Sequence, residues 1–383
     1  MECCFDMKRI ISILLACFLF SFEGICCTSV IISGKATRDG RPLMLKHRDT
    51  GELNNRLQWF QGEKYSFVGL VNSSWEKERV AKHPFARGEV WTGTNSAGFS
   101  IMNTATYDLK DDKVADEFMD REGELMYRAL EICKDVSDFE VLLDTLSRPM
   151  GVEANFGVID AYGGACYYEV NNHKWTKFDV NEEEKGYRVV TNFTMTGRPK
   201  QRKGVDRYNR ASKLMNEVPK MSYRTDSQRV YLVKDIYSHK GLFNVISRSG
   251  SPILRDITAC SIVIEGVKSG ENPLHTVMWT CLGLPTCIPY IPVLVLDSDH
   301  IPFYLKKGES GENAEFCDLA LSEKAKRGLE PRTEGFEVEK FIDEKFDVII
   351  ENWREGKIDT DQFGSFYDTF IRMAYKQYIS TGR

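Results

Sequence analysis

Two adjacent cysteines, Cys26 and Cys27, stand directly after an apolar run near the start of the chain, at residues 10–22. A cysteine that becomes the first residue of a mature chain carries two reactive groups. Its thiolate attacks a carbonyl carbon, and its α-amino group, with an ordinary pKa of about 7.7–8.0, accepts a proton without a histidine. The position of these cysteines therefore predicts a nucleophile that proteolytic processing uncovers.

The residues before Cys27 have the composition of a secretory leader. Lys8 and Arg9 form a short basic region, and the apolar run that follows is 13 residues long, too short to span a bilayer comfortably. Gly24 and Cys26 are small residues at positions −3 and −1 of the Cys26–Cys27 bond. We therefore expect residues 1–26 to be a signal peptide and the mature protein, residues 27–383, to be secreted or periplasmic.

Other interpretations of the two cysteines stay open. They can be incidental residues near a processing site, or one of them can be lipid-modified, which would make the protein a membrane-anchored lipoprotein. The run Glu-Gly-Ile-Cys before Cys27 is a poor match to a lipoprotein signal, so the lipoprotein is the less favoured reading. Cleavage one residue earlier would make Cys26, instead of Cys27, the mature N-terminus.

Composition excludes several classes of protein. The net charge is −5, hydrophobic residues are 42% and charged residues 28% of the chain, as in an ordinary globular protein. A long basic block is absent, so we expect no nucleic-acid partner. Beyond the leader, the chain has no apolar run of membrane-spanning length. The expected partner is a small molecule, and the oligomeric state is left open, a homo-oligomer included.

Cysteine and histidine spacing predicts neither a metal site nor a cofactor. Seven cysteines remain after the leader, without the tight spacing of a disulfide scaffold. The six histidines are scattered and no Cys/His cluster has zinc spacing. A bridge between Cys281 and Cys287 in an oxidising compartment stays open.

The order of elements favours an α+β domain with layers. Strand patterns and helix patterns occur in blocks and do not alternate one by one. The mature chain is expected to open with a hairpin, 28–33 and 43–48, joined by a turn at Asp39–Gly40. Further strands are expected at 65–71, 89–95, 99–105, 154–161, 165–171, 186–192, 258–266, 275–281 and 291–297. Helices are expected at 114–134, at 137–146 with Ser137 as N-cap, within 205–248, and in the tail at 335–356 and 359–379.

Four short motifs resemble those of a known family in the same order. They are the run from Cys27 to Asp49, the segment "TNSAGFSIMNTA" at 94–105, "VVTN" at 189–192 and "DRYNRA" at 206–211. Together they resemble the cysteine-type N-terminal nucleophile hydrolases that act on linear amides. This group includes choloylglycine (bile salt) hydrolases, penicillin V acylases and isopenicillin-N acyltransferase-like proteins. The resemblance implies an αββα sandwich, here one domain with a C-terminal helical extension that includes the polar stretch 305–334.

The resemblance also implies roles for residues of this chain. Cys27 is the nucleophile and base, and Asp49 holds the α-amine. The family has Arg-Asn-x-Asp where this chain has Lys46-His47-Arg48-Asp49, so either Lys46 or Arg48 carries the positive charge, and Arg48 is preferred.

Three further motif positions would complete the resemblance. Asn192 matches the oxyanion-hole amide, and the backbone N–H of Asn103 or Thr104 would be the second donor. Arg207 matches the arginine on the helix, with Arg210 as its substitute. Tyr107, Tyr167, Tyr168 and Trp175 either line an apolar pocket or belong to the core.

Two classes of function follow from these residues. The first is an exported hydrolase that cleaves the C–N bond of a linear, non-peptide or N-acyl amino acid type amide through an acyl-enzyme on Cys27. An acyltransferase that passes the acyl group to an amine would use the same residues. The second class is a non-catalytic exported lipoprotein with the same fold. The acyl donor itself cannot be predicted from these motifs.

Overall fold

The computed structural model describes residues 26–74, 88–109, 113–115, 118–217, 223–224, 230–231, 239–308, 311–330 and 333–381. Two large antiparallel sheets form the centre of the molecule. The predicted leader, apart from Cys26, lies outside the described residues. The two-stranded ribbon of β11 (Tyr223–Arg224) and β12 (Val230–Tyr231) stands apart from both sheets.

The first sheet has six strands and contains the chain segment that begins at the two cysteines. Its spatial order is β10 (Tyr187–Val190), β1 (Cys26–Ile32), β2 (Leu43–Asp49), β13 (Thr258–Glu265), β14 (Val277–Leu282) and β15 (Ile291–Val293). The β1–β2 hairpin turns at Gly40, whose φ of 81° a residue with a side chain rarely adopts. The predicted hairpin is therefore present, and β1 lies between β2 and β10.

The second sheet has seven strands that follow one another in chain order. They are β3 (Asn55–Gln61), β4 (Ser66–Asn72), β5 (Thr92–Asn95), β6 (Ser100–Ala105), β7 (Ala154–Ile159), β8 (Ala165–Val170) and β9 (Trp175–Asp179). It packs face to face on the first sheet, with β1 against β6 and β8 and with β2 against β7. Gly157 allows this approach, because a Cβ there would lie 3.1 Å from Ile31 Cδ1 and 2.7 Å from Met102 Cε.

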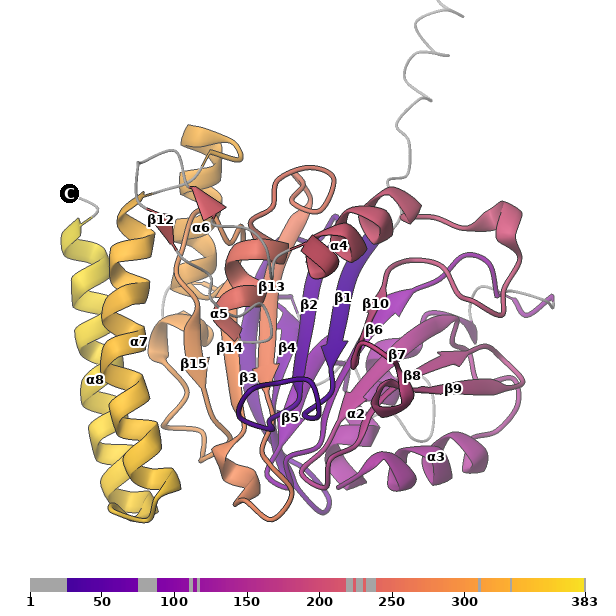
Figure 1. Cartoon of the computed structure of the whole chain (residues 1–383), viewed down its shortest axis with the longest axis horizontal. Coiled ribbons are helices and arrows are strands. Elements are labelled where there is room, and N and C mark those ends of the chain that lie inside the picture. Colours follow the sequence, from indigo (N-terminus) through magenta and orange to yellow (C-terminus); the bar gives the residue numbers. More distant parts are fainter. Residues whose placement is uncertain are drawn as a thin grey trace, which may run out of the picture.

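Helices cover the outer face of each sheet (Figure 1). Helices α2 (Glu122–Ile132) and α3 (Val136–Thr145) lie on the seven-stranded sheet, and the remaining helices lie on the six-stranded sheet or flank it. These are α4 (Val205–Glu217), α5 (His239–Gly241) with the π-helical turn Leu242–Ser247, α6 (Glu315–Arg327), α7 (Thr333–Arg354) and α8 (Thr360–Thr381). The arrangement is the four-layer αββα sandwich with C-terminal helices that the sequence predicts.

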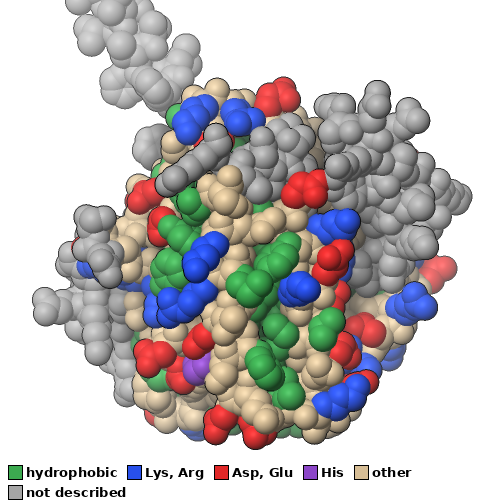
Figure 2. Space-filling view, turned by 90° about the vertical axis from the view of Figure 1, so that its left-hand side faces the viewer, with side chains coloured by type: hydrophobic (Ala, Val, Ile, Leu, Met, Phe, Trp, Pro, Cys, Tyr) green, Lys and Arg blue, Asp and Glu red, His purple; other side chains and the backbone are tan. Residues whose placement is uncertain are grey.

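Helices α7 and α8 form an antiparallel pair at one side of the molecule. Their inner residues, such as Phe346 and Tyr367, are buried against each other and against the sheet. The outer surface of the pair is not uniformly polar. Figure 2 looks onto this side and shows hydrophobic side chains gathered in a strip between charged ones.

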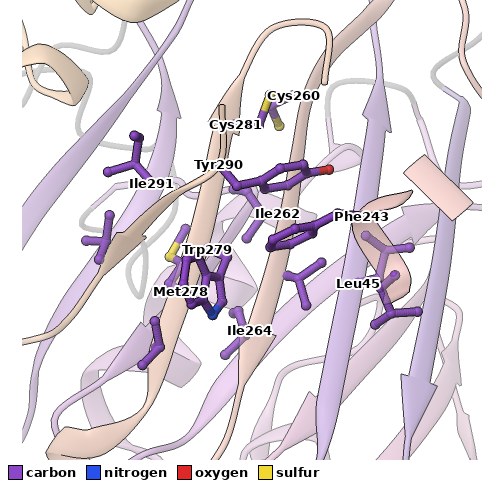
Figure 3. Packing of buried hydrophobic residues seen from close by; sticks show 14 of the residues in the cluster. Leu45, Phe243, Cys260, Ile262, Ile264, Met278, Trp279, Cys281, Tyr290 and Ile291 are labelled. Carbon is purple, nitrogen blue, oxygen red and sulfur yellow. The ribbon is translucent and has the colours of Figure 1, made fainter. Parts of the chain in front are cut away.

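The main hydrophobic core fills the space between the two sheets and beneath the outer helices. Figure 3 shows part of it around β13 and β14. Phe243, from the π-helical turn, stacks on Tyr290 with 3.7 Å between ring centroids, and Trp279 packs at the edge of Phe243. The second core lies between the seven-stranded sheet and helices α2 and α3. Tyr168 and Trp175 belong to this second core.

Several sequence expectations differ from the structure at particular residues. Helix α2 begins at Glu122 and not at 114, because Asp120 has a φ of 61°, which no helix continues. The N-cap of α3 is Asp135, whose carboxylate accepts from the Asp138 N–H at 2.9 Å, and Ser137 lies inside the helix. Strands β3 and β9 were not predicted. Helix α6 lies within the polar stretch 305–334, where Phe316, Cys317 and Ala320 are buried.

We expect Phe243→Ala to destabilise the fold strongly. Phe243 is 3% exposed, and truncation of a buried aromatic ring removes its packing and leaves a cavity, at a cost of about 3–5 kcal/mol. Val141, which is 62% exposed on α3, is the matched control, and Val141→Ala should change the free energy of unfolding by less than about 0.5 kcal/mol. Urea unfolding followed by circular dichroism measures both. Equal midpoints would contradict this description of the core.

Candidate active site

Strand register places the Cys27 thiol between the two sheets. In the β1–β2 ladder, Cys27 is opposite Arg48 and Cys26 is opposite Asp49. Side chains alternate along a strand, so Cys27 points to the same side as Ser29. The Ser29 hydroxyl accepts a hydrogen bond from the Tyr167 hydroxyl of the facing sheet at 3.0 Å. Cys27 is 2% exposed, at the end of β1 beside α4 (Figure 1).

Asn192 holds the nitrogen of Cys27, and Arg207 holds the Cys27 carbonyl and the Asn192 amide. The Cys27 N–H donates to Asn192 Oδ1 at 2.7 Å, and Arg207 Nη2 donates to the same oxygen at 2.7 Å. Arg207 Nη1 donates to the Cys27 carbonyl oxygen and, at 3.2 Å, to Thr28 Oγ1. Asn192 Nδ2 donates to the Ala105 carbonyl at 2.7 Å, which fixes the orientation of the amide.

Arg207, rather than its substitute Arg210, therefore reaches Cys27. All of Cys27, Asn192 and Arg207 are buried. They come from β1, from the residues after β10 and from α4, so three separated parts of the chain meet at the Asn192 amide oxygen. The role of Asn192 as an oxyanion donor stays a prediction, because the amide oxygen is the atom that contacts the Cys27 nitrogen.

Two buried cations lie near the thiol, and the structure favours Lys46 over Arg48. Lys46 Nζ donates to Asn103 Oδ1 at 2.6 Å and to the Trp91 carbonyl. Arg48 donates to Asn55 Oδ1 and to Asn72 Oδ1 and lies over the Trp91 ring. The charge of Lys46 acts on the Cys27 thiol more strongly than that of Arg48. Lys46 thus has the larger effect on the thiol, and which of the two is the functional cation stays a prediction.

Burial and charge act in opposite directions on this site. Burial raises the pKa of the Cys27 thiol, and the positive charge of Lys46 lowers it. Burial in turn lowers the pKa of Lys46 from 10.5 to about 8. Lys46 is charged below that pH, so a thiolate on Cys27 has a cation beside it at neutral pH.

Asp49 and His47 project from the other face of β2. The Asp49 carboxylate accepts a hydrogen bond from Thr258 Oγ1 at 2.8 Å and lies 3.9 Å from Arg255 Nη1. Its negative charge raises the pKa of the Cys27 thiol, and a hydrogen bond from its own backbone N–H lowers it. Burial lowers the pKa of His47 to about 3. His47 is therefore neutral and faces away from the thiol, so it does not form a Cys–His pair.

The other residues singled out from the sequence have different places. The Asn103 side chain accepts from Lys46, and Thr104 Oγ1 donates to the Thr191 carbonyl at 2.7 Å. Whether either backbone N–H acts as an oxyanion donor stays a prediction. Tyr107 lies close enough to Cys27 for the charge of the thiolate to raise its pKa, in addition to a larger effect of burial.

Sequence reasoning missed the backbone carbonyls of Trp91 and Ala105, which hold Lys46 and Asn192. Backbone acceptors leave no signal in residue type. It also missed Cys260, which lies opposite Arg48 on β13, on the same face of the sheet as Cys27 and with β2 between them. Burial raises the pKa of Cys260 to about 12, so its thiol is protonated. Cys281 and Cys287 are both buried free thiols.

A groove runs along the edge strand β10, and none of Cys27, Lys46, Asn192 and Arg207 lines it. It has a volume of about 390 Å³ and is lined by Phe178, Glu183, Lys185, Tyr187, Arg188, Val189, Met195, Tyr208, Ser212 and Asn216. A smaller cavity of about 10 Å³ continues toward Asn155, Tyr167, Thr191 and Phe193, next to Asn192. The larger volume, about 390 Å³, is enough to hold a small-molecule ligand.

Neither metal ligands nor a membrane span is found in the part of the chain that the structure describes. Among those residues, no three His, Cys, Asp or Glu side chains are grouped as metal ligands. None of the described helices combines the length and the apolar composition needed to cross a bilayer.

Three solved structures are similar to this chain in fold, and all three belong to proteins whose names describe amide or acyl bond hydrolysis. The N-acylethanolamine-hydrolyzing acid amidase orthologue of Caenorhabditis elegans has a TM-score of 0.44 and 15% identity, over 62% of this chain and 92% of that one. A variant of conjugated bile acid hydrolase from Clostridium perfringens has a TM-score of 0.44 and 11% identity, over 70% and 92%. Penicillin V acylase from Agrobacterium tumefaciens has a TM-score of 0.41 and 14% identity, over 70% and 86%.

No protein-family model and no curated protein matches this sequence.

Removal of the Lys46 charge should raise the pKa of the Cys27 thiol more than removal of the Arg48 charge. An opposite charge nearby favours the ionised form, so Lys46→Met should move the thiol pKa upward by about one pH unit or more. Arg48→Met should give a smaller change, and Lys46→Arg should leave the thiol pKa close to that of the unchanged protein. The measurement is the pH dependence of thiol alkylation in folded protein that begins at Cys27. A larger change for Arg48→Met would restore Arg48 as the functional cation.

Proposed function

We propose that the chain is an exported amide hydrolase that cleaves a linear N-acyl amide through an acyl-enzyme on an N-terminal Cys27. The observation that carries this proposal is the contact between the Cys27 nitrogen and Asn192. The Cys27 N–H donates to the buried Asn192 amide oxygen, and the buried Arg207 guanidinium fixes that oxygen by donating to it as well. Removal of residues 1–26 would turn this nitrogen into a primary amine without moving it from Asn192.

The proposed reaction runs in two halves. In the first, the α-amine accepts the thiol proton, Cys27 Sγ bonds to the amide carbon, and the C–N bond breaks as the ammonium returns the proton to the leaving amine. A thioester remains on Cys27. In the second half, a water gives a proton to the α-amine and attacks the thioester, the C–S bond breaks, and the thiol regains the proton as the acid leaves.

The neighbours of Cys27 have distinct parts in this scheme. Asn192 Oδ1 orients the amine by accepting one of its N–H groups, and Arg207 orients Asn192. Lys46 stabilises the thiolate, and Asn103 positions Lys46. The neutral His47, on the opposite face of its strand, leaves the α-amine as the base. The groove along β10 has room for a substrate of small-molecule size.

Leader removal and activity should be coupled. A chain in which the residues before Cys27 cannot be removed should fold but not turn over an N-acyl amide, because Cys27 then lacks a free amine. Cys27→Ala in the mature chain should also abolish turnover, whereas Cys26→Ala should affect processing alone. Mass spectrometry of the mature protein gives the first residue. A diacylglyceryl group on Cys26 would favour the lipoprotein, and turnover by the uncleaved chain would exclude the α-amine as base.

Asn192→Ala should reduce kcat far more than it weakens substrate binding. Asn192 either orients the base or donates to the oxyanion, and both contributions belong to the transition state. The loss of one oxyanion donor costs about 10²–10³ in kcat. The control is Asn155→Ala, since Asn155 is buried near Thr191 but has no bond to Cys27. Steady-state kinetics corrected for the folded fraction separates the two. If Asn192→Ala had a normal kcat and a lowered melting temperature, Asn192 would have a structural role alone.

The activity should be highest at a pH below about 8 and should fall above it. Activity rises as the α-amine loses its proton, and it falls as Lys46, with a pKa of about 8, loses its charge beside the thiolate. Lys46→Arg keeps a cation at high pH and should move the alkaline fall upward. The pH profile of kcat/KM for both proteins is the measurement. An alkaline limb that does not move in Lys46→Arg would assign it to another group.

A further inference from the structure

Two buried carboxylates contact the loop that leads from Asn192 toward helix α4. The pairing of β10 with β1 ends at Val190, which lies opposite Ser29. From Thr191 onward the chain has left the strand ladder, so contacts outside the sheet must fix the place of Asn192. Its side-chain amide has such contacts, described above, and the backbone that follows it has others.

Glu169 of β8 accepts three hydrogen bonds from this loop. The Met195 N–H donates to Glu169 Oε1 at 2.5 Å, and the Thr196 N–H donates to Oε2 at 3.0 Å. The Thr196 hydroxyl also donates to Oε2, at 2.5 Å. Glu169 is 6% exposed, whereas Met195 and Thr196 are exposed. The loop therefore lies at the surface, and both oxygens of a buried carboxylate hold its backbone there.

Asp108 holds the same loop from a second side. Its Oδ2 accepts from the Thr194 N–H at 3.0 Å, and its backbone carbonyl accepts from the Arg198 N–H at 2.9 Å. Gly197 packs directly on this residue, since a Cβ there would lie 2.7 Å from Asp108 Cγ. Asp108 is 1% exposed. Residues 194–198 thus wrap around a buried aspartate.

The segment that contains Asp108 also contacts the Asn192 side chain. The Ala105 carbonyl, three residues before Asp108, accepts from Asn192 Nδ2 at 2.7 Å. Thr194, which Asp108 holds, is two residues after Asn192. One short stretch, residues 105–108, therefore contacts both the amide of Asn192 and the backbone just beyond it, so a shift of the loop would be felt at the amide.

The two carboxylates depend on the loop for their donors. In the described part of the chain, backbone N–H groups and the Thr196 hydroxyl donate to them, and no lysine or arginine does. Burial raises the pKa of Asp108, the hydrogen bonds from Thr194 lower it, and the negative charge of Glu169 raises it. Departure of the loop would leave two buried charges without donors, which is far more costly than the loss of ordinary hydrogen bonds.

We propose that Asp108 and Glu169 are positioning residues, which fix the loop after Asn192 and thereby hold the Asn192 oxygen at the Cys27 nitrogen. This inference rests on the function proposed above. The Cys27 N–H donates to Asn192 and to neither carboxylate, so both carboxylates act on the reaction through Asn192.

A double-mutant cycle with an N-acylglycine as substrate tests this role. Glu169→Gln keeps the length of the side chain but places an amide against a loop N–H. In the mature protein it should lower kcat by about tenfold to a hundredfold, as misplacement of a catalytic group does. In the Asn192→Ala background it should lower kcat by less than about twofold, because the group through which it acts is gone. Asp108→Asn should give the same pattern.

The matched control is Glu265→Gln. Glu265 is 8% exposed and pairs with Arg354 at 2.8 Å, and it lies at the opposite end of the β2–β13 pairing from Arg48. Loss of its charge should lower the melting temperature but leave kcat per folded molecule unchanged in both backgrounds. A merely structural role of Glu169 would give the same result as this control.

Hydrogen exchange followed by mass spectrometry reports on the loop without any substrate. The peptide that contains residues 194–196 should exchange slowly in the unchanged protein, faster in Glu169→Gln, and at the unchanged rate in Glu265→Gln. Thr196→Val removes one donor to Glu169 and leaves the carboxylate in place. It should show the same changes in exchange and kcat at a smaller size, and it serves as the variant if Glu169→Gln does not fold.

The outcomes separate this inference from the proposed function. Equal losses of kcat with and without Asn192, a faster-exchanging loop with normal kcat, or an exchange rate that neither carboxylate variant changes would overturn the inference alone. If the unchanged protein hydrolysed no N-acylglycine, the proposed function would fail and the role in catalysis with it. The exchange rates would then still show whether the carboxylates hold the loop.

Discussion

The hydrogen bond between the Cys27 nitrogen and Asn192 Oδ1 is the contact on which the rest of the site depends. It joins the first residues of β1 to the residues just after β10. Arg207 of α4 donates a hydrogen bond to the same Asn192 oxygen. Because all three residues are buried, an unpaired N–H or guanidinium here would be costly. The fold therefore sets the place of this nitrogen before the proposed cleavage would make it an amine, and the β1–β2 register sets which groups surround it.

The electrostatics of the site follow from its position between two sheets. Burial disfavours the charged form of each ionisable group there. It lowers the pKa of Lys46 and raises the pKa of the Cys27 thiol. Lys46 keeps its charge at neutral pH through the Asn103 and Trp91 oxygens, which are neutral acceptors. Because these two acceptors are uncharged, the positive charge of Lys46 can act on the Cys27 thiolate. A carboxylate partner would have neutralised that charge.

The sequence predicted the parts of this arrangement that residue type and order reveal. β-Branched runs and the Asp39–Gly40 turn indicated the β1–β2 hairpin, and motif order indicated Cys27, Asn192 and Arg207. Lys46 and Arg48 lie on the same face of β2, so the choice between them depends on what each contacts across the sandwich, and the local sequence allows both. Strand β9 was missed because it is a half-exposed edge with weak alternation, and α6 because its buried face is only Phe316, Cys317 and Ala320 in a polar stretch. The roles of the Trp91 and Ala105 carbonyls leave no trace in residue identity.

The central claim is that an N-terminal Cys27 becomes acylated during turnover. It is tested most directly by mass spectrometry of the mature protein, quenched in acid during reaction with a slowly hydrolysed N-acyl amide and then digested. The account predicts a thioester adduct with the mass of the acyl group on the peptide that begins at Cys27, and free thiols at Cys133, Cys166 and Cys260. An adduct on another residue, or steady turnover with no adduct on Cys27 and an unchanged rate in Cys27→Ala, would contradict it.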